Sequence, residues 1–161
     1  MVNEQHGLDP IVFDDSEILI LGSLPGRKSI ETGMYFANRG NRFWPMMARF
    51  YGKAKPESKE QMADFLERHR IALWDVYKSA VREGSSDESM TDSKYNDIIE
   101  FLKKHDTIKK ILVAGKKAQQ GFEEHNKGIR NDVEYFPVPS TSGANAHFDE
   151  NKWREAIEYK F

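Results

Sequence analysis

The chain has 161 residues, a formal net charge of -2 at pH 7 and no cysteine. This length predicts one domain, residues 1–161, whose core needs no covalent cross-link. The absence of cysteine excludes disulfides and thiolate metal sites, and a charge near zero excludes a strong overall attraction to nucleic acid. No apolar stretch approaches the roughly 20 residues that span a bilayer, and the start lacks signal-peptide features. We therefore expect a cytoplasmic protein without a membrane partner.

Four short apolar runs predict strands, and helical patterns separate them. The strands are expected at residues 17–21, 71–74, 110–114 and 134–138. Helices are expected around 43–50 and 62–69, around 95–102 with Ser93 as N-cap, from Lys116 onward and over 149–159. The polar segment 82–92 reads as a loop. This alternation predicts an α/β fold, a single three-layer α/β/α domain with a central, mainly parallel four-stranded sheet.

The stretch from Gly22 to Met47 directly follows the first predicted strand and is rich in glycine, asparagine and aromatic residues. Open α/β sheets bind ligands at the carboxyl ends of their strands, so this stretch predicts a pocket there. It begins with Gly22–Gly26 (GSLPG), where glycine permits close backbone approach and Pro25 stiffens the turn. The glycine spacing of a P-loop or a dinucleotide fingerprint is missing. An ordinary strand-to-loop turn is the alternative interpretation.

Two further segments have the composition of a binding site. Asn41 immediately precedes a helical pattern, so the simplest role for it is an N-cap. Phe36 falls outside that pattern, and its ring could lie across the pocket and stack on a base. After the last predicted strand, residues 139–146 (PSTSGANA) combine hydroxyl side chains with glycine, a composition that exposes backbone N–H groups to a phosphate. A plain polar loop is the alternative.

Taken together, these segments form an ordered set that resembles a known family. The set is GSLPG, YFANRGNRFW, IALWDVYKSA, ILVAGKKA and PSTSGANA. It resembles the uracil-DNA glycosylase superfamily, most of all the branch of the hypoxanthine-DNA glycosylases, with the mismatch-specific uracil/thymine enzymes as cousins. The resemblance extends from about residue 18 to residue 157. It implies a monofunctional DNA glycosylase, a hydrolase of base excision repair that flips a deaminated base out of DNA and hydrolyses its N-glycosidic bond. We also expect the protein to be a monomer.

The resemblance also implies roles for residues of the first two segments. Asn41 matches the essential asparagine of the hypoxanthine branch and is expected to be catalytic, with an amide that orients water. Capping uses only its side-chain oxygen, so the two roles are compatible. Phe36 matches the aromatic residue on which the flipped base stacks. The backbone N–H groups of Ser23 and Leu24 are expected to bind base oxygens. Leu24 stands where the mismatch-specific enzymes have an asparagine, so no water-binding role transfers to it.

The segment PSTSGANA corresponds to the family's intercalation loop. Ser140 stands where the main uracil enzymes carry a histidine, and Ser142 matches the serine that contacts the flanking phosphate. Gly143 belongs to the same DNA-binding loop. Ala144 matches the wedge residue that fills the stack vacated by the flipped base. Because alanine is small, Asn145 is expected to supply that bulk, and it is also expected to contact the base.

Further DNA contacts are expected from Arg39 and from Lys116 at a helix start, with solvated surface charges as the alternative. Ala114 stands where some relatives present an asparagine to the pocket. No metal or cofactor is expected, because the hydrolysis needs only an oriented water. The expected partner is DNA containing a deaminated base.

Two other functions remain open at this stage. One is a serine esterase-type hydrolase with Ser23 as nucleophile and His147 with Asp149 late in the chain, although that order and spacing are unusual. The other is a catalytically weak nucleic-acid-binding member of the fold.

Overall fold

The computed structural model describes residues 3–125 and 128–160, and a parallel sheet lies at its centre. The strands are β2 (Ile18–Gly22), β3 (Ile71–Asp75), β6 (Lys110–Ala114) and β7 (Glu134–Val138). They are hydrogen-bonded in the order β3-β2-β6-β7, and every pair is parallel. The predicted α/β class and four-stranded sheet are therefore confirmed.

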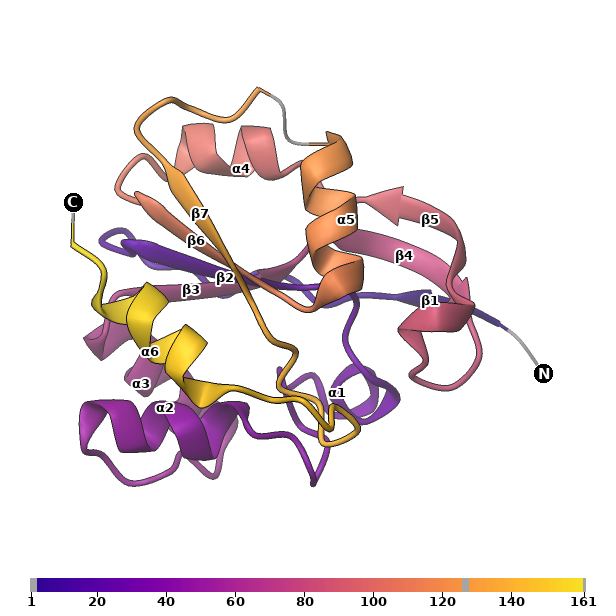
Figure 1. The fold of residues 1–161 in the computed structure, drawn as a ribbon, viewed down its shortest axis with the longest axis horizontal. Helices are drawn as coiled ribbons and strands as arrows, with labels where there is room; N and C mark the ends of the chain where they lie inside the picture. The colour runs from indigo at the N-terminus through magenta and orange to yellow at the C-terminus, as the bar shows by residue number, and fades with distance from the viewer. Residues whose placement is uncertain (1–2, 126–127, 161) are drawn as a thin grey trace.

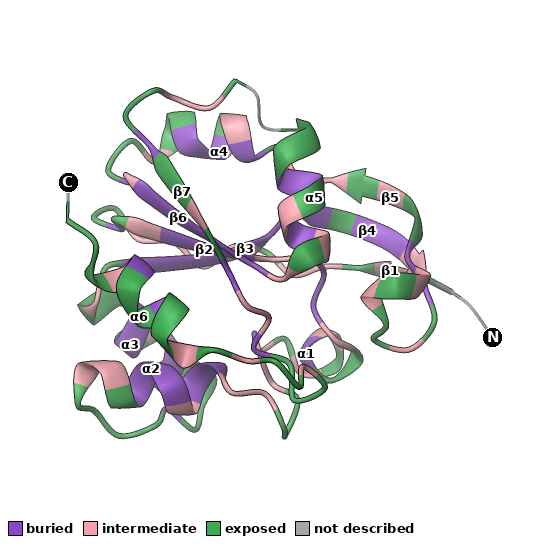
Figure 2. Ribbon diagram, in the orientation of Figure 1, coloured by how far each residue is buried: buried purple, intermediate pink, exposed green. Residues whose placement is uncertain are grey.

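Helices cover both faces of this sheet (Figure 1). On one face lie α2 (Phe43–Tyr51), α3 (Lys59–Arg68) and α6 (Glu150–Glu158). On the other lie α4 (Ile98–Lys104) and α5 (Lys116–His125). Successive side chains of a strand point to opposite faces, and β2 follows this rule, since Leu19 and Leu21 pack in one core and Ile20 in the other. The central strands are accordingly buried almost throughout (Figure 2).

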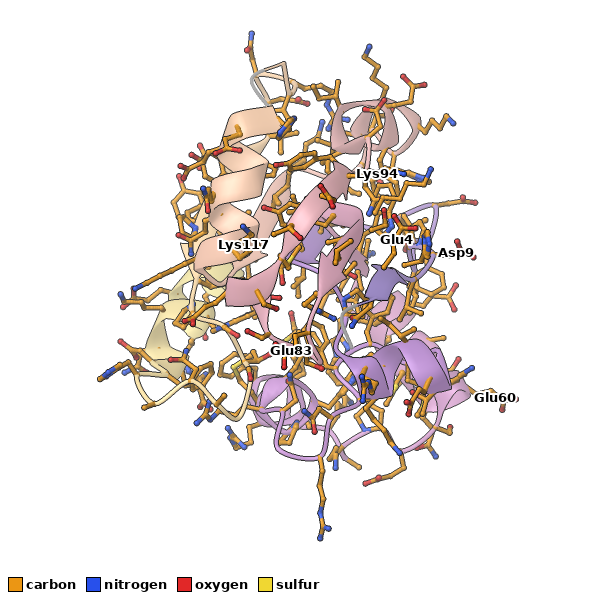
Figure 3. The ribbon with its side chains drawn as sticks, turned by 90° about the vertical axis from the view of Figure 1, so that its right-hand side faces the viewer. Glu4, Asp9, Glu60, Glu83, Lys94 and Lys117 are labelled. Carbon is orange, nitrogen blue, oxygen red and sulfur yellow. The ribbon has the colours of Figure 1, made fainter. Side chains whose placement is uncertain are left out.

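A second sheet adjoins the first and was not predicted from the sequence. It consists of β1 (Asn3–His6), β4 (Tyr77–Arg82) and β5 (Thr91–Tyr95), antiparallel in the order β1-β4-β5. Figure 3 shows this side of the molecule, with the exposed Glu4 on β1 and Lys94 on β5. Polar side chains dominate β1 and β5, so neither strand has the apolar alternation that reveals a strand in a sequence.

This second sheet corrects two expectations for the middle of the chain. The predicted loop 82–92 is shorter, because Arg82 still belongs to β4, Asp87–Ser89 form a 3₁₀ turn and β5 begins at Thr91. The helix expected over 95–102 begins only at Ile98, and its N-cap is Asp97, whose side chain accepts a hydrogen bond from the Glu100 N–H, not Ser93. The reason is that Ser93 lies within β5, which pairs with β4.

A short helix, α1 (Arg27–Thr32), also went unpredicted, and it ends at Gly33 with a φ of 70°. None of the helices in the described ranges is both long and apolar enough to cross a bilayer. The expectation that residues 1–161 form a single domain stays a prediction, and residues 1–2, 126–127 and 161 lie outside the described part.

Candidate functional site

A pocket opens at the carboxyl ends of β2, β3 and β6, where the sequence predicted one. Its volume is about 140 Å³. A cavity of roughly 150 Å³ admits a benzene ring, so the pocket suits one ring-sized ligand. The lining combines the three loops singled out in the sequence with the ends of β3 and β6. It includes Ser23, Leu24, Phe36, Asn41, Asp75, Ala114, Ser140, Thr141 and Ser142.

Phe36 forms one wall of the pocket in a strained backbone conformation. Its φ is 57°, a left-handed value that is unusual for a bulky residue and costs about 1–3 kcal/mol. The Ser29 hydroxyl accepts a hydrogen bond from the Ala37 N–H at 3.0 Å, which holds the turn. The Phe36 ring stacks on Phe43, with 4.0 Å between ring centroids and 20° between planes. Packing on the buried Phe43 ring thus fixes the orientation of the Phe36 ring, which lines the pocket.

Asn41 lies at the mouth of the pocket, just before α2. The structure corrects its position by one residue, since Arg42 occupies the backbone N-cap position. The Asn41 side chain nevertheless acts as a cap, because its Oδ1 accepts a hydrogen bond from the Phe43 N–H at 2.9 Å. Its Nδ2 makes no hydrogen bond to a residue in the described ranges. The carboxamide is therefore held by its oxygen and keeps its donor group for a ligand.

The GSLPG loop is held by a buried arginine that the sequence analysis placed in a polar loop. Arg82 is 1% exposed and donates to the carbonyls of Leu24 at 3.3 Å and Pro25 at 2.5 Å. The Tyr77 N–H donates to the Ser23 carbonyl at 3.0 Å. These bonds fix the peptide planes of the loop, and with them the directions of its N–H groups.

Arg82 is in turn paired with Asp87, at 3.1 Å between Nη1 and Oδ1. The Ser23 hydroxyl donates to the other carboxylate oxygen of Asp87 at 2.6 Å. Burial lowers the pKa of Arg82, and the adjacent Asp87 opposes that shift. No sequence pattern signalled this network, because Ser23 is far in sequence from Arg82 and Asp87.

The intercalation loop expected from the sequence is bound to the loop that carries Asn41. The Arg42 N–H donates to the Thr141 carbonyl at 2.9 Å, and the Arg42 guanidinium donates to the Ser142 carbonyl at 2.7 Å. Thr141 is buried, whereas Ser142, Gly143 and Ala144 are exposed at the rim. The two loops thus form one continuous edge of the pocket.

Gly143 marks the closest approach of these two loops and provides a first test. A Cβ at Gly143 would lie 2.7 Å from the backbone oxygen of Gly40, so Gly143→Ala must push the loops apart. Small displacements in a site reduce rates by up to about 100-fold, and we expect a loss of at least about tenfold. Gly40→Ala is the matched control, because its Cβ meets its nearest atom at 3.8 Å. Rates measured for both variants on DNA containing a deaminated base, the substrate that the resemblance implies, test this prediction, and equal rates would contradict it.

The remaining predicted residues lie outside the pocket. Asn145 and Lys116 line a neighbouring groove, and Arg39 is exposed. The Asn145 side chain is engaged within its own loop, since Nδ2 donates to the Ser140 carbonyl at 3.0 Å and Oδ1 accepts from the His147 N–H at 3.1 Å. A base contact by Asn145 would require these bonds to break.

Asp75 is a pocket residue that was not predicted from the sequence, because the second predicted strand, residues 71–74, was expected to end at Trp74. It is the last residue of β3 and only 4% exposed. Its Oδ2 is buried without a hydrogen-bond partner in the described residues. Burial, and secondarily Asp87, raise the pKa of Asp75 to about 7, although Arg82 opposes the shift. One feature of the sequence could have identified Asp75. It is a carboxylate at the end of an apolar strand, and ligands bind at that edge of a parallel sheet.

The geometry does not support the esterase alternative. The Ser23 hydroxyl is bonded to Asp87, and the lining of the pocket contains no histidine among the described residues. A serine nucleophile needs a base within hydrogen-bond reach. Over the described ranges, His, Asp and Glu side chains also form no group of three able to hold a metal ion.

Comparisons with known proteins agree with this geometry. A family described as the uracil DNA glycosylase superfamily has a model that matches residues 10–159. Two relatives are each named hypoxanthine DNA glycosylase. The one from Methanosarcina acetivorans is 34% identical over 152 residues, 94% of either chain. The one from Methanosarcina barkeri is 30% identical over 159 residues, 96% of this chain and 99% of the relative.

A solved structure is similar as well. It is the solution NMR structure of a Methanosarcina acetivorans protein described as a candidate uracil DNA glycosylase. The TM-score is 0.82 at 33% sequence identity, over 96% of this chain and 95% of that chain. The similarity therefore covers all three loops of the pocket.

Proposed function

Because the chain belongs to the uracil DNA glycosylase superfamily, we propose that it excises deaminated bases from DNA, hypoxanthine first and uracil second. It is a hydrolase of N-glycosyl bonds that acts by base flipping in base excision repair. The observation that carries this proposal is the pairing of an oriented aromatic face, Phe36, with the unused amide donor of Asn41 in a ring-sized pocket. We further propose that the enzyme acts as a monomer in the cytoplasm.

The reaction follows from the positions of these residues. The extruded base stacks on Phe36, whose ring is already held by Phe43, so little ordering is needed on binding. The C1′–N bond then breaks, and its electron pair goes to the base. Backbone N–H groups of Ser23 and Leu24, in a loop fixed by Arg82, stabilise this charge as oriented dipoles. Asn41 holds the water whose oxygen bonds to C1′, and the released proton goes to solvent.

The rim of the pocket suits the DNA backbone. Ser142, Gly143 and Ala144 are exposed beside the mouth, where the serine hydroxyl and loop N–H groups can contact the phosphate that flanks the flipped nucleotide. Ser140 lines both the pocket and the groove that contains Lys116. Arg39 and Lys116 supply positive charge for phosphate contacts. Asn145 shapes this loop through its hydrogen bond to Ser140.

An excision panel tests the proposal. Labelled duplexes with a single hypoxanthine, uracil or xanthine, and an undamaged duplex, are incubated with the protein and cleaved with alkali at abasic sites. We expect cleavage of the hypoxanthine duplex first, the uracil duplex more slowly and the undamaged duplex not at all. Binding without an abasic product would favour the weak nucleic-acid-binding alternative and overturn the proposal.

A further inference from the structure

Asp75 occupies the deep end of the pocket, and no side chain in the described ranges forms a hydrogen bond or an ion pair with its carboxyl group. It pairs in register with Gly22 of β2. A Cβ at Gly22 would lie 2.7 Å from Asp75 Oδ1, so the missing side chain keeps this oxygen open toward the pocket that both residues line. Oδ2 has no partner in the described residues. Because a buried polar group without a partner is unfavourable, such a group calls for an explanation.

The charged and titratable groups that face Asp75 leave it without a counter-ion. Asp87 disfavours a negative charge on Asp75, whereas Arg82 favours it. The Arg82 guanidinium, however, is engaged by Asp87, by Gln5 and by the carbonyls of the GSLPG loop. Tyr35 is a further neighbour, and its hydroxyl donates to the Asp9 carbonyl at 2.8 Å. Burial therefore keeps this carboxyl group protonated, and so uncharged, at pH values below its raised pKa of about 7.

Depth in the pocket identifies the part of the substrate that reaches Asp75. Asn41 is only half-buried and Ser142 is exposed, whereas Asp75 is 4% exposed. The sugar and phosphates of a flipped nucleotide remain attached to the duplex and stay at the mouth. Only the edge of the base farthest from the sugar can enter as deep as Asp75.

We propose that Asp75 is a catalytic residue, which as an uncharged acid donates a hydrogen bond to the extruded base and stabilises the negative charge that the base acquires. This inference rests on the glycosylase function proposed above. Hypoxanthine and uracil both carry a lactam edge, a carbonyl oxygen next to an N–H. A carboxylic acid offers a donor next to an acceptor and matches that edge, whereas an ionised carboxylate offers only acceptors. The proton stays on Asp75 throughout, so the step is a hydrogen bond and not a proton transfer.

The sign of the pH dependence follows from this role. The active form is protonated, so activity is present below the pKa of about 7 and is lost as the pH rises through it. A carboxylate that activated water as a general base would give the opposite profile, with a rate that rises through the same range. The direction of the profile therefore separates the two roles.

The test measures single-turnover excision of hypoxanthine across the acidic, neutral and alkaline range for three variants. Asp75→Asn keeps a donor beside an acceptor but cannot ionise, so its rate should stay near the wild-type rate at acidic pH and lose the decline above about pH 7. Asp75→Ala removes the donor and should lower the acidic-side rate by about 30-fold. Ser79→Ala is the matched control, since Ser79 Oγ is another buried atom without a partner in the described residues and does not line the pocket. This control should retain the wild-type rate and pH profile.

Each outcome either supports or overturns the proposal. A wild-type rate that rises through neutral pH overturns it, as does an Asp75→Asn variant with the wild-type decline or with the full defect of Asp75→Ala. If Asp75→Ala is unfolded in a thermal melt, the pH profile of the near-isosteric Asp75→Asn decides alone. A wild-type protein that excises no base at any pH refutes the glycosylase function itself, which is a different result from excision that is indifferent to Asp75.

Discussion

Replacing Asn41 with alanine is expected to slow hypoxanthine excision by about 1,000-fold, the upper end of the effect of removing one oriented donor from an active site. The Asn41 amide is held through its oxygen by the Phe43 N–H, so its Nδ2 is presented to the pocket in a fixed direction. Without it, the attacking water loses its position and the sugar loses an oriented dipole. Single-turnover excision with excess enzyme measures this step directly, independent of product release.

The same substitution removes a helix cap, and the controls must separate the two effects. Loss of the cap should lower the free energy of unfolding by about 1 kcal/mol. Asn41→Asp keeps the capping oxygen and loses the donor, so we expect wild-type thermal stability together with the catalytic defect. Asn38→Ala changes another asparagine that lines the pocket and should have a minor effect. If Asn41→Asp excised hypoxanthine at the wild-type rate, the defect of Asn41→Ala would come from loss of the helix cap and not from loss of the amide donor.

Replacing Phe36 with alanine is expected to slow excision by about 100-fold, because stacking on an aromatic ring contributes about 1–3 kcal/mol per base. The defect should appear as weaker binding of lesion-containing DNA together with slower excision, since the base loses the surface that keeps it out of the duplex. Phe36→Tyr keeps the aromatic face and should remain active. Titration of lesion and undamaged duplexes, followed by single-turnover kinetics, measures both components.

The left-handed backbone at Phe36 allows a sharper version of this test. Glycine adopts a φ of 57° without strain, so Phe36→Gly should recover part of the stability that loss of the ring costs, yet remain as inactive as the alanine variant. Phe50→Ala is the matched control, since Phe50 packs on the same core cluster but does not line the pocket. It should lower stability and spare excision. If Phe36→Gly and Phe50→Ala were equally active, Phe36 would be a packing residue and not a base-stacking one.

The sequence was informative where a segment carries its own signal. The central strands β2 and β6 are apolar because both faces of the sheet are covered, and this pattern can be read without a structure. Phe36 and Asn41 could be selected because one falls outside the helical pattern and the other lies just ahead of it. The structure brings both to the pocket together with Ser23, Leu24, Ser140 and Ser142. Their individual roles stay predictions until the variants are measured.

The sequence failed where a residue obtains its role from distant partners. β1 and β5 are strands because they pair with β4, and the polar side chains of these two segments do not predict a strand. Arg82 looks like one charge in a polar stretch until folding buries it against Gln5 and the GSLPG carbonyls. Likewise the sequence did not indicate that Ser140 and His147 engage the Asn145 amide, and the base contact expected of Asn145 stays a prediction.

The amino-acid sequence by itself therefore determined the fold class and the edge of the sheet where the pocket lies, since hydrophobic periodicity and loop composition are local properties. The family was indicated separately, by the resemblance of its ordered motifs. Only the tertiary structure decided which polar groups are engaged and which are left for a substrate. Asp75 shows why. Its burial, its missing partner and the open space at Gly22 come from the packing of β2 against β3 and of β4 beside them. A carboxyl group acquires a shifted pKa from its surroundings, and those surroundings exist only once the chain has folded.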